Sequence, residues 1–282
     1  MAAALAVTTM TRADLDIAVE WAAAEGWNPG LDDADAFLAA DAGGFLIGRL
    51  GAEPVAVISA VRYGREAGFL GFYIVAPARR GQGHGWAIWQ AAMARFGERP
   101  AGLDGVVAQQ ANYARSGFVL AHKNIRYGGR PGDLPEPADV AIVEASAVPI
   151  ADLLDFDRRH FQADRAAFAR AWYLAGGRQS RVALADGRIV GLATVRPCRE
   201  GHKIGPLFAE DAAVAEALFA DAVRAAAPGP VFLDVPEPNA AARALAERHG
   251  LEPVFETARM YRGAAPDLPL GRIFGITSFE LG

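Results

Sequence analysis

The sequence predicts an α/β protein with a mixed sheet, arranged as two similar domains in tandem. Short apolar runs that suit strands alternate with amphipathic stretches whose apolar residues recur with the helical period. The order of these runs repeats, because a nearly constant spacing separates Gly71 from Gly205 and Gly117 from Gly250. A segment rich in glycine and proline lies between the two copies and has the composition of a linker.

Each copy opens with the same series of elements. An apolar run begins the copies at residues 5–9 and 140–144, and amphipathic helical stretches follow. A pair of strand-like runs comes next, and Asp186-Gly187 in the second pair is a strong signal for a two-residue hairpin turn. The predicted helical stretches include residues 14–24 and 150–161, and the predicted strand pairs are residues 45–50 with 55–62 and residues 181–185 with 189–195.

We therefore divide the chain into two domains, a linker and a tail. The tail has strand-like runs at residues 272–276 and 278–281, and we expect it to cross back towards the interface between the halves. The predicted boundaries are residues 1–128 for the N-terminal domain, 129–138 for the linker, 139–265 for the C-terminal domain and 266–282 for the tail.

Composition and charge exclude several classes of protein. Hydrophobic residues make up 52% of the chain and charged residues 22%, which is typical of a globular protein rather than a disordered one. The net charge of -5 lacks the basic excess of a nucleic-acid-binding protein, and a single cysteine, Cys198, excludes internal disulfides and a Cys-rich metal site. No apolar stretch reaches the roughly 20 residues of a membrane helix. We therefore expect a protein of the bacterial cytoplasm that binds no nucleic acid, membrane or metal. A homodimer is a possible state of this protein.

The most informative stretch combines a strand, a glycine-rich loop and a helix. The strand ends at Ala76-Pro77, because proline cannot donate a hydrogen bond to a strand ladder. Glycines in the loop would let an anion approach the free N–H groups at the start of the helix, where the helix dipole attracts negative charge. The spacing matches neither a dinucleotide fingerprint nor a Walker loop, so an ordinary glycine-rich helix start is the alternative. The helix is predicted over residues 86–96, with Trp86, Trp89, Met93 and Phe96 on one face.

Two motifs in the first copy resemble those of the GNAT superfamily of N-acetyltransferases. Arg80-x-x-Gly83-x-Gly85, after a strand that ends in Ala76-Pro77, resembles the family's acyl-CoA pyrophosphate motif. Downstream, Tyr113-Ala114-Arg115-Ser116-Gly117-Phe118 resembles the family's Tyr-x-x-x-Gly-Phe. The motifs are far more specific together than alone, and the resemblance covers residues 3–128. Val106 stands where many members have an asparagine that contacts the cofactor, so that contact is not carried over.

The resemblance implies a fold and an activity. Each domain would be a mostly antiparallel twisted sheet flanked by helices, with one strand splayed away from its neighbour to admit the pantetheine arm. The enzyme would transfer an acetyl group from acetyl-CoA to a primary amine of a small molecule, by direct attack through a tetrahedral intermediate. Tyr113 would protonate the departing thiolate, with a half-buried core tyrosine as the alternative. The implied cofactor-binding residues are Tyr73, Ile74, Val75, Arg79, Arg80, Gly81, Gln82, Gly83, His84 and Gly85.

The second copy resembles the same fold without its cofactor machinery. Residues 213–219, which correspond to the loop, contain no glycine and no arginine but include Glu216. The position of Tyr113 corresponds to Ala246. A catalytic domain followed by such a degenerate one resembles a bacterial tandem group of GNAT proteins, in which the second domain would be structural or would shape the acceptor pocket.

The base and the acceptor site are less well defined. An alkyl ammonium has a pKa of about 10.4, so a base must remove a proton near neutral pH. Glu66, Asp104, His122 or a chain of water molecules could serve. For the acceptor, Trp27 and Asn28 combine an apolar face with directed hydrogen bonds, and a purely structural role for Trp27 is the alternative.

Two other functions use the same loop. A non-catalytic acyl-CoA sensor would bind the cofactor and show no turnover with any amine. An acetyltransferase of protein lysines or N-termini would need an open acidic cleft, whereas a lid formed by the second domain favours a small metabolite.

Overall fold

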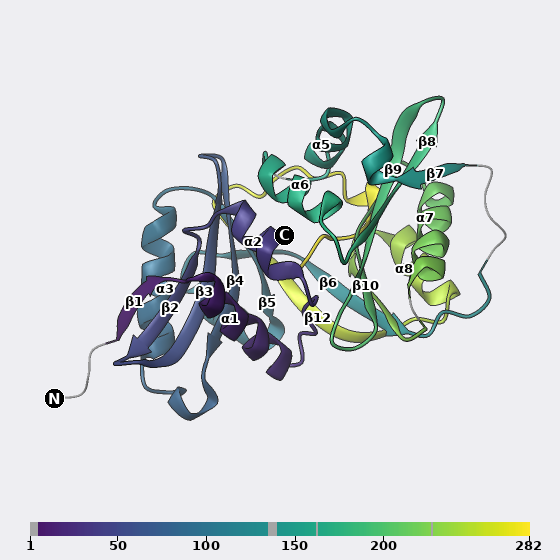
Figure 1. Ribbon diagram of the computed structural model, residues 1–282. Helices are drawn as coiled ribbons and strands as arrows, with labels where there is room; N and C mark the ends of the chain where they lie inside the picture. The colour runs from purple at the N-terminus through teal and green to yellow at the C-terminus, as the bar shows by residue number, and fades with distance from the viewer. Residues whose placement is uncertain (1–4, 135–139, 162, 227) are drawn as a thin grey trace.

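The computed structural model describes residues 5–134, 140–161, 163–226 and 228–282. Within these residues, thirteen strands form one continuous sheet that extends through both halves of the molecule, with helices on its faces (Figure 1). No helix of this described part is long and apolar enough to cross a membrane.

The first half of the chain supplies six of the strands. Helix α1 begins at Arg12 because Thr11 and Asp14 form a capping box, in which each side chain accepts a hydrogen bond from the other residue's N–H group. The elements are β1 (Ala6–Thr9), α1 (Arg12–Ala24), α2 (Asp33–Ala40), β2 (Phe45–Leu50), β3 (Glu53–Tyr63), β4 (Ala67–Val75), α3 (His84–Phe96), β5 (Ala101–Val106), α4 (Gln110–Ala114) and β6 (Val119–Gly129).

The second half repeats this order of elements and adds a final short strand. They are β7 (Ala141–Glu144), α5 (Ile150–Arg158), α6 (Ala166–Leu174), β8 (Gln179–Ala185), β9 (Arg188–Pro197), β10 (His202–Ala209), α7 (Ala212–Ala225), β11 (Val231–Pro236), α8 (Ala240–Arg248), β12 (Glu252–Arg262) and β13 (Ile273–Gly275). The predicted class is confirmed, because among the described strands only β4 with β5 and β10 with β11 pair in parallel, and the other neighbours are antiparallel.

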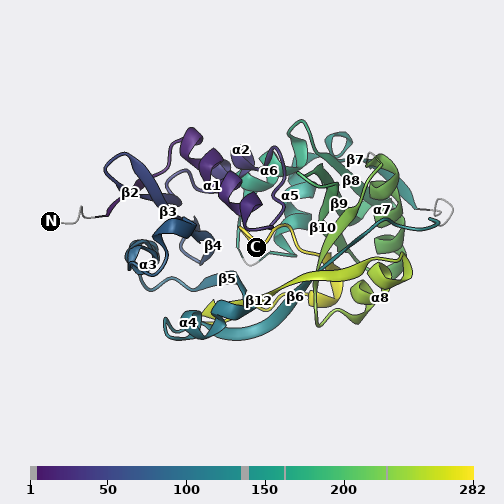
Figure 2. The same ribbon diagram turned by 90° about the horizontal axis from the view of Figure 1, so that it is seen from below.

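The two halves exchange their last long strands. β6 lies between β11 and β12, and β12 lies between β5 and β6. Figure 2 shows β12 beside β6. Tyr127 of β6 is the register partner of Leu233 in β11, and Tyr261 of β12 is that of Gly102 in β5. Each half therefore completes its part of the sheet with a strand from the other half.

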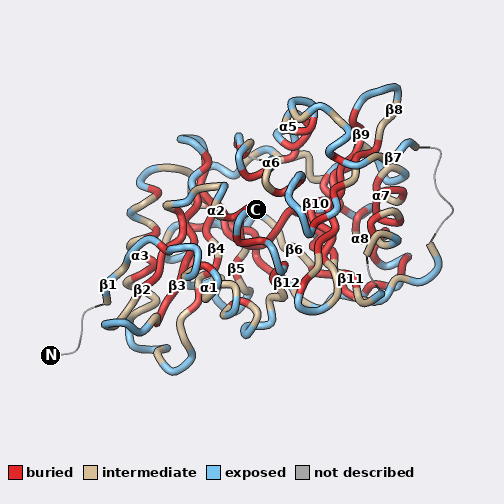
Figure 3. The backbone as a smooth tube through the Cα atoms, in the orientation of Figure 1, coloured by how far each residue is buried: buried red, intermediate tan, exposed pale blue. Residues whose placement is uncertain are grey.

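Alternating side chains of the strands divide the core into layers. Ile47 and Val57 face a core shared with α1, α2, α5 and α6, whereas Leu46 and Ile58 face the core under α3. The shared core joins the halves, because Phe37 of α2 stacks on Trp172 of α6 with ring centroids 6.0 Å apart. A third core lies under α7 and α8, and Figure 3 shows that buried residues follow the strands through the molecule.

The C-terminal tail runs back from the second half to the first. β13 pairs with β10, and the Ile276 N–H donates a hydrogen bond of 2.9 Å to the Asp234 carbonyl oxygen in β11. Farther along, the Tyr63 hydroxyl of β3 donates a hydrogen bond of 2.9 Å to the Leu281 carbonyl oxygen. The last residues of the chain therefore lie against the sheet of the first half.

Two local predictions are wrong. Residues 278–281 form a turn and not a strand, because the Gly282 N–H bonds back to the Ser278 carbonyl oxygen at 3.1 Å. Helix α3 starts at His84, since Gly83 takes the left-handed conformation that begins it. Trp86, predicted on the apolar face, is 59% exposed, and the buried face consists of Ile88, Trp89, Ala92 and Phe96.

A buried ion pair connects these elements. The Arg126 guanidinium of β6 donates to both carboxylate oxygens of Asp234 in β11, at 2.6 and 2.8 Å. It also donates to the Trp27 carbonyl oxygen at 2.8 Å, and it lies over the Phe279 ring, 4.7 Å from the centroid. One side chain thus contacts two central strands, the loop after α1 and the tail.

We predict that Asp234→Asn lowers the free energy of unfolding at pH 7 by about 3–5 kcal/mol, because it leaves Arg126 buried without its counter-ion. Burial is the largest influence on Asp234 and opposes its ionisation, but the charge and hydrogen bonds of Arg126, together with the charges of Lys203 and Arg196, outweigh burial and hold the pKa of this carboxyl below its usual value. This contribution to stability is therefore complete above about pH 4 and is lost as the pH falls through the lowered pKa.

Urea unfolding at pH 7 and at pH 3 measures both effects. Asp186→Asn, in the exposed turn between β8 and β9, is the control and should match the wild type. Equal stability of the two variants at pH 7 would contradict the prediction.

Candidate functional site

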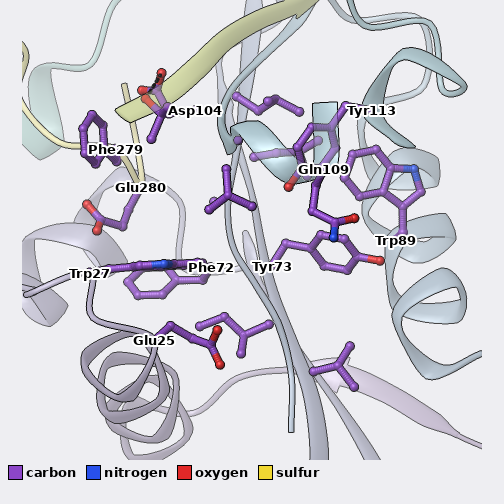
Figure 4. Close-up of a pocket in the computed structure, with 18 of the residues that line it drawn as sticks. Glu25, Trp27, Phe72, Tyr73, Trp89, Asp104, Gln109, Tyr113, Phe279 and Glu280 are labelled. Carbon is purple, nitrogen blue, oxygen red and sulfur yellow. Dashed lines mark hydrogen bonds between the residues drawn. The ribbon is translucent and has the colours of Figure 1, made fainter. Parts of the chain in front are cut away.

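A pocket of about 400 Å³ lies beside the end of β4, where the first half meets β12 and the tail of the second half (Figure 4). Its lining includes three carboxylates and seven aromatic residues. The lining residues are Glu25, Trp27, Leu70, Gly71, Phe72, Tyr73, Ile74, Val75, Arg80, Trp89, Leu103, Asp104, Gly105, Val106, Gln109, Tyr113, Phe255, Thr257, Phe279 and Glu280.

The pocket exists because β4 and β5 separate. They pair in parallel only from Gly68 to Leu70 on β4, although the strands continue to Val75 and Val106. Phe72, two residues beyond the last pair, has a φ of 48°, which breaks the regular strand conformation there. Past this point, the described residues of β5 give β4 no ladder partner, so its polar backbone groups on that side face the pocket.

The glycine-rich loop follows at the end of the separated strand. Gly81 and Gly83 have φ angles of 73° and 84°, which glycine adopts without steric cost. Gly83 caps α3, and no described side chain bonds to the N–H groups at this helix start. A Cβ at Gly85 would lie 2.9 Å from the Tyr73 hydroxyl, so glycine keeps the space between the helix start and β4 free. The loop thus has the features of an anion site.

The charged and amide side chains of the loop already have protein partners. Arg79 is half-buried, pairs with Glu53 at 2.6 Å and is outside the pocket lining. Arg80 lines the pocket, donates to the Val75 carbonyl oxygen at 3.0 Å and pairs with Glu25. Gln82 and His84 are outside the lining, as are the loop glycines. An anion would therefore meet backbone groups first, with Arg80 at the edge of the pocket.

Tyr113 forms part of an aromatic wall. Its ring stacks on Trp89 with centroids 5.6 Å apart, and Trp89 in turn lies 5.2 Å from Tyr73. Gly105 of β5 permits this arrangement, because any Cβ there would collide with the Tyr113 ring. Burial, followed by the neighbouring Tyr73, raises the pKa of Tyr113, and no described residue bonds to its hydroxyl. The phenol is therefore protonated at neutral pH and has a free proton to donate.

The structure separates the two residues predicted for the acceptor. Trp27 lines the pocket and is half-buried. Asn28 is outside the lining, and its side chain exchanges two hydrogen bonds with the backbone of Glu200, at 2.9 and 3.0 Å. The Lys203 ammonium also donates to the Asn28 carbonyl oxygen, at 2.9 Å. Asn28 therefore binds the second half of the chain and not the pocket.

The candidate bases from the sequence are also separated. Asp104 lines the pocket but forms an ion pair with Arg259, with one contact at 2.8 Å, and accepts a hydrogen bond from Asn124 at 2.7 Å. His122 is outside the lining, and burial followed by the Arg259 charge lowers its pKa to about 4. Glu66 lies exposed in the turn between β3 and β4.

Sequence analysis missed the residues that come from the second half of the chain. Phe255 and Thr257 reach the pocket because β12 enters the first half's sheet, and Phe279 and Glu280 reach it through the tail. In Figure 4, Phe279 and Glu280 lie on the side of Trp27, across the pocket from Tyr113 and Trp89. The apolar end of the tail, with one glutamate among aromatic and aliphatic residues, was the available signal.

The second half has no equivalent of the gap between β4 and β5 among its described residues, because other segments fill it. β10 and β11 pair only from His202 to Ile204 on β10, after which β13 inserts and pairs with β10 at Leu207 and Phe208. Residues 213–219 lie within α7, as the sequence predicts. The Asp211 carboxylate caps this helix by accepting from two N–H groups at 2.9 Å, so the helix start already has an anion. In the second half, the tail thus fills the gap between the parallel strands, and Asp211 occupies the helix start. Both places are open in the first half.

Comparisons with known proteins agree with this geometry. Residues 13–118 match the model of the acetyltransferase (GNAT) family, and residues 153–275 match an acetyltransferase (GNAT) domain model. A holothin acyltransferase from a Pseudoalteromonas species is 34% identical over 264 residues, which cover 93% of this chain and 90% of that protein.

Solved structures show the same fold at lower identity. A putative acetyltransferase from Pyrococcus horikoshii superposes with a TM-score of 0.82 at 22% identity, covering 99% of this chain and 96% of that one. A tandem GNAT protein from the clavulanic acid biosynthesis pathway gives a TM-score of 0.63 at 15% identity, covering 93% and 100%. GNAT acyltransferases use an acyl-CoA as co-substrate, together with an acceptor. This chain belongs to the GNAT family and is a tandem acyltransferase.

Proposed function

We propose that this acyltransferase moves the acetyl group of acetyl-CoA to a primary amine of a small molecule. The observation that carries the proposal is the pocket where β4 and β5 separate. It combines strand backbone that β5 leaves unpaired with the buried phenol of Tyr113, and it lies next to the start of α3, which has no side-chain cap among the described residues. These features suit a pyrophosphate, the amides of a pantetheine arm and a departing sulfur.

The residues around the gap between β4 and β5 fit the acetyl donor, acetyl-CoA. Pantetheine carries amide groups, and the backbone of Tyr73, Ile74 and Val75 lines the pocket where such groups would bind. An N–H group of this strand near Ile74 would hold the thioester oxygen as negative charge develops on it. The small glycines at the start of α3 leave room for a phosphate to contact the backbone.

The size of the pocket and the segments that border it favour a small acceptor. Its volume of about 400 Å³ falls in the range of small-molecule sites, and residues of β12 and the tail border it opposite Tyr113. A lysine or N-terminus of a folded protein would have to pass these segments. Holothin, which the Pseudoalteromonas relative is named for acylating, is one acceptor to test.

An amine panel tests the proposed function. Purified protein would be incubated with acetyl-CoA and alkyl, aryl and amino-acid amines, holothin and a lysine peptide, and acetylated products would be detected by mass spectrometry. We expect amide formation with at least one small amine. Acetylation of the peptide alone, or hydrolysis of acetyl-CoA without an amide product, would overturn the proposal.

We predict that acetyl-CoA stabilises the protein through the loop before α3. At 100 times its dissociation constant, a ligand adds about 2.7 kcal/mol to the free energy of unfolding. Gly83→Asp should abolish this gain, because it places a carboxylate at the helix start. Gly187→Asp is the matched control, since both glycines have positive φ and open space around them. Thermal unfolding with and without acetyl-CoA measures the shift, and an equal shift in both variants would contradict the prediction.

We predict that Tyr113→Phe lowers kcat by 10²–10⁴-fold and leaves the acetyl-CoA stabilisation intact, because it removes only the proton donor. The raised pKa of Tyr113 also means that the wild type should show no loss of activity from phenol ionisation up to about pH 10. Steady-state rates between pH 6 and pH 10 measure both effects. An unchanged kcat in the variant would assign Tyr113 a packing role only.

A further inference from the structure

One carboxylate in the pocket has no assigned partner. Of the three that line it, Glu25 pairs with Arg80 and Asp104 pairs with Arg259. Glu280 is only 4% exposed, yet no described residue forms a hydrogen bond or an ion pair with its carboxylate. A carboxylate that lines a pocket and has no protein partner is available to a ligand.

The tail holds Glu280 firmly at the point where β4 leaves β5. Its backbone packs on Gly71, where a Cβ would collide with the Glu280 carbonyl oxygen. Gly71 follows the last residue of β4 that pairs with β5, and it precedes the irregular Phe72. On the other side, the Tyr63 hydroxyl fixes the Leu281 carbonyl oxygen. Glu280 is thus held beside the backbone that would bind the thioester.

The charges around Glu280 leave it available to a ligand. Arg126 of β6 and Arg196 of β9 are close enough for charge interaction with it. Each of these cations has a closer partner, however: Arg126 contacts Asp234 at 2.6 Å, and Arg196 contacts Asp33 at 3.1 Å. Neither arginine forms a hydrogen bond or an ion pair with the Glu280 carboxylate, so this carboxylate stays available to a ligand.

We propose that Glu280 binds the amino group of the acceptor and takes up its proton, an inference that rests on the proposed function. Trp27 and Phe279 lie on the same side of the pocket and suit an ammonium on an apolar body. Glu280 lies across the pocket from Tyr113, so the acceptor and the sulfur would have separate proton-transfer groups.

The proposed step balances. The ammonium gives one proton to the Glu280 carboxylate, and the free amine then forms a C–N bond to the thioester carbon. When the C–S bond breaks, Tyr113 gives its proton to the sulfur. The nitrogen loses its second proton to solvent, and solvent returns a proton to Tyr113. Glu280 releases its proton to solvent, so the products are the amide, the thiol of CoA and one proton.

Glu280→Gln tests this role, because it keeps the shape of the side chain and removes the base. For an alkyl amine at pH 7, we expect kcat/KM to fall at least 100-fold. The loss should shrink as the pH approaches the amine pKa of about 10.4, since the free amine needs no base. An amine that is already neutral at pH 7 should lose far less. Glu280→Asp, which keeps the carboxylate, should restore part of the rate.

Two further variants separate this role from a structural one. Glu98→Gln, in the exposed turn after α3, is the matched control and should behave as the wild type. Gly71→Ala should displace the Glu280 backbone and so lower kcat/KM in the same pH-dependent way. Thermal stabilisation by acetyl-CoA should be unchanged in Glu280→Gln.

The outcomes are distinct. If the wild type acetylates no amine, the proposed function fails and the role of Glu280 fails with it. If the wild type is active, only the role of Glu280 is overturned by a Glu280→Gln variant that keeps its rate at pH 7. An equal loss at every pH and with every amine would also overturn it.

Discussion

The contact between Arg126 and Asp234 is the interaction on which the rest of the structure depends. It joins β6 of one half to β11 of the other, at positions that are register partners in these neighbouring strands. The same guanidinium holds the Trp27 carbonyl oxygen and covers the Phe279 ring. A charge buried this deeply is tolerated only with its counter-ion and hydrogen bonds in place, so the strand exchange, the loop after α1 and the tail are fixed together.

Both halves contain a pair of parallel strands that separate, but the gap is open in the first half and filled in the second. In each, a pair of parallel strands separates after three residue pairs and leaves strand backbone without its neighbour. In the first half the gap remains a pocket, next to a helix whose N–H groups have no described side-chain cap. In the second half β13 fills the gap and Asp211 caps the helix, which satisfies the same polar groups from within the chain. The tail therefore fills the gap in the second half through β13 and lines the pocket of the first half through the residues that follow.

Local parts of the site could be predicted from the sequence because their chemistry is encoded in short stretches. The glycines at 81 and 83 do take positive φ, and Tyr73, Ile74, Val75 and Tyr113 all line the pocket. The role of Asn28 could not be predicted, because its partner Glu200 lies in the other half of the chain. Asp104 and His122 could not be ranked either. Arg259, which pairs with Asp104 and adds to the effect of burial in lowering the pKa of His122, comes from the inserted β12.

The sequence by itself determined the α/β class, the repeated order of elements, the glycine-rich helix start and the loss of that loop in the second copy. These follow from periodicity and from local backbone preferences, which act over a few residues. Only the tertiary structure decided that β6 and β12 change places and that Phe279 and Glu280 enter the pocket. Strand pairing between distant segments is selected by burial and by complementary hydrogen bonds across the whole sheet, and no local pattern specifies it.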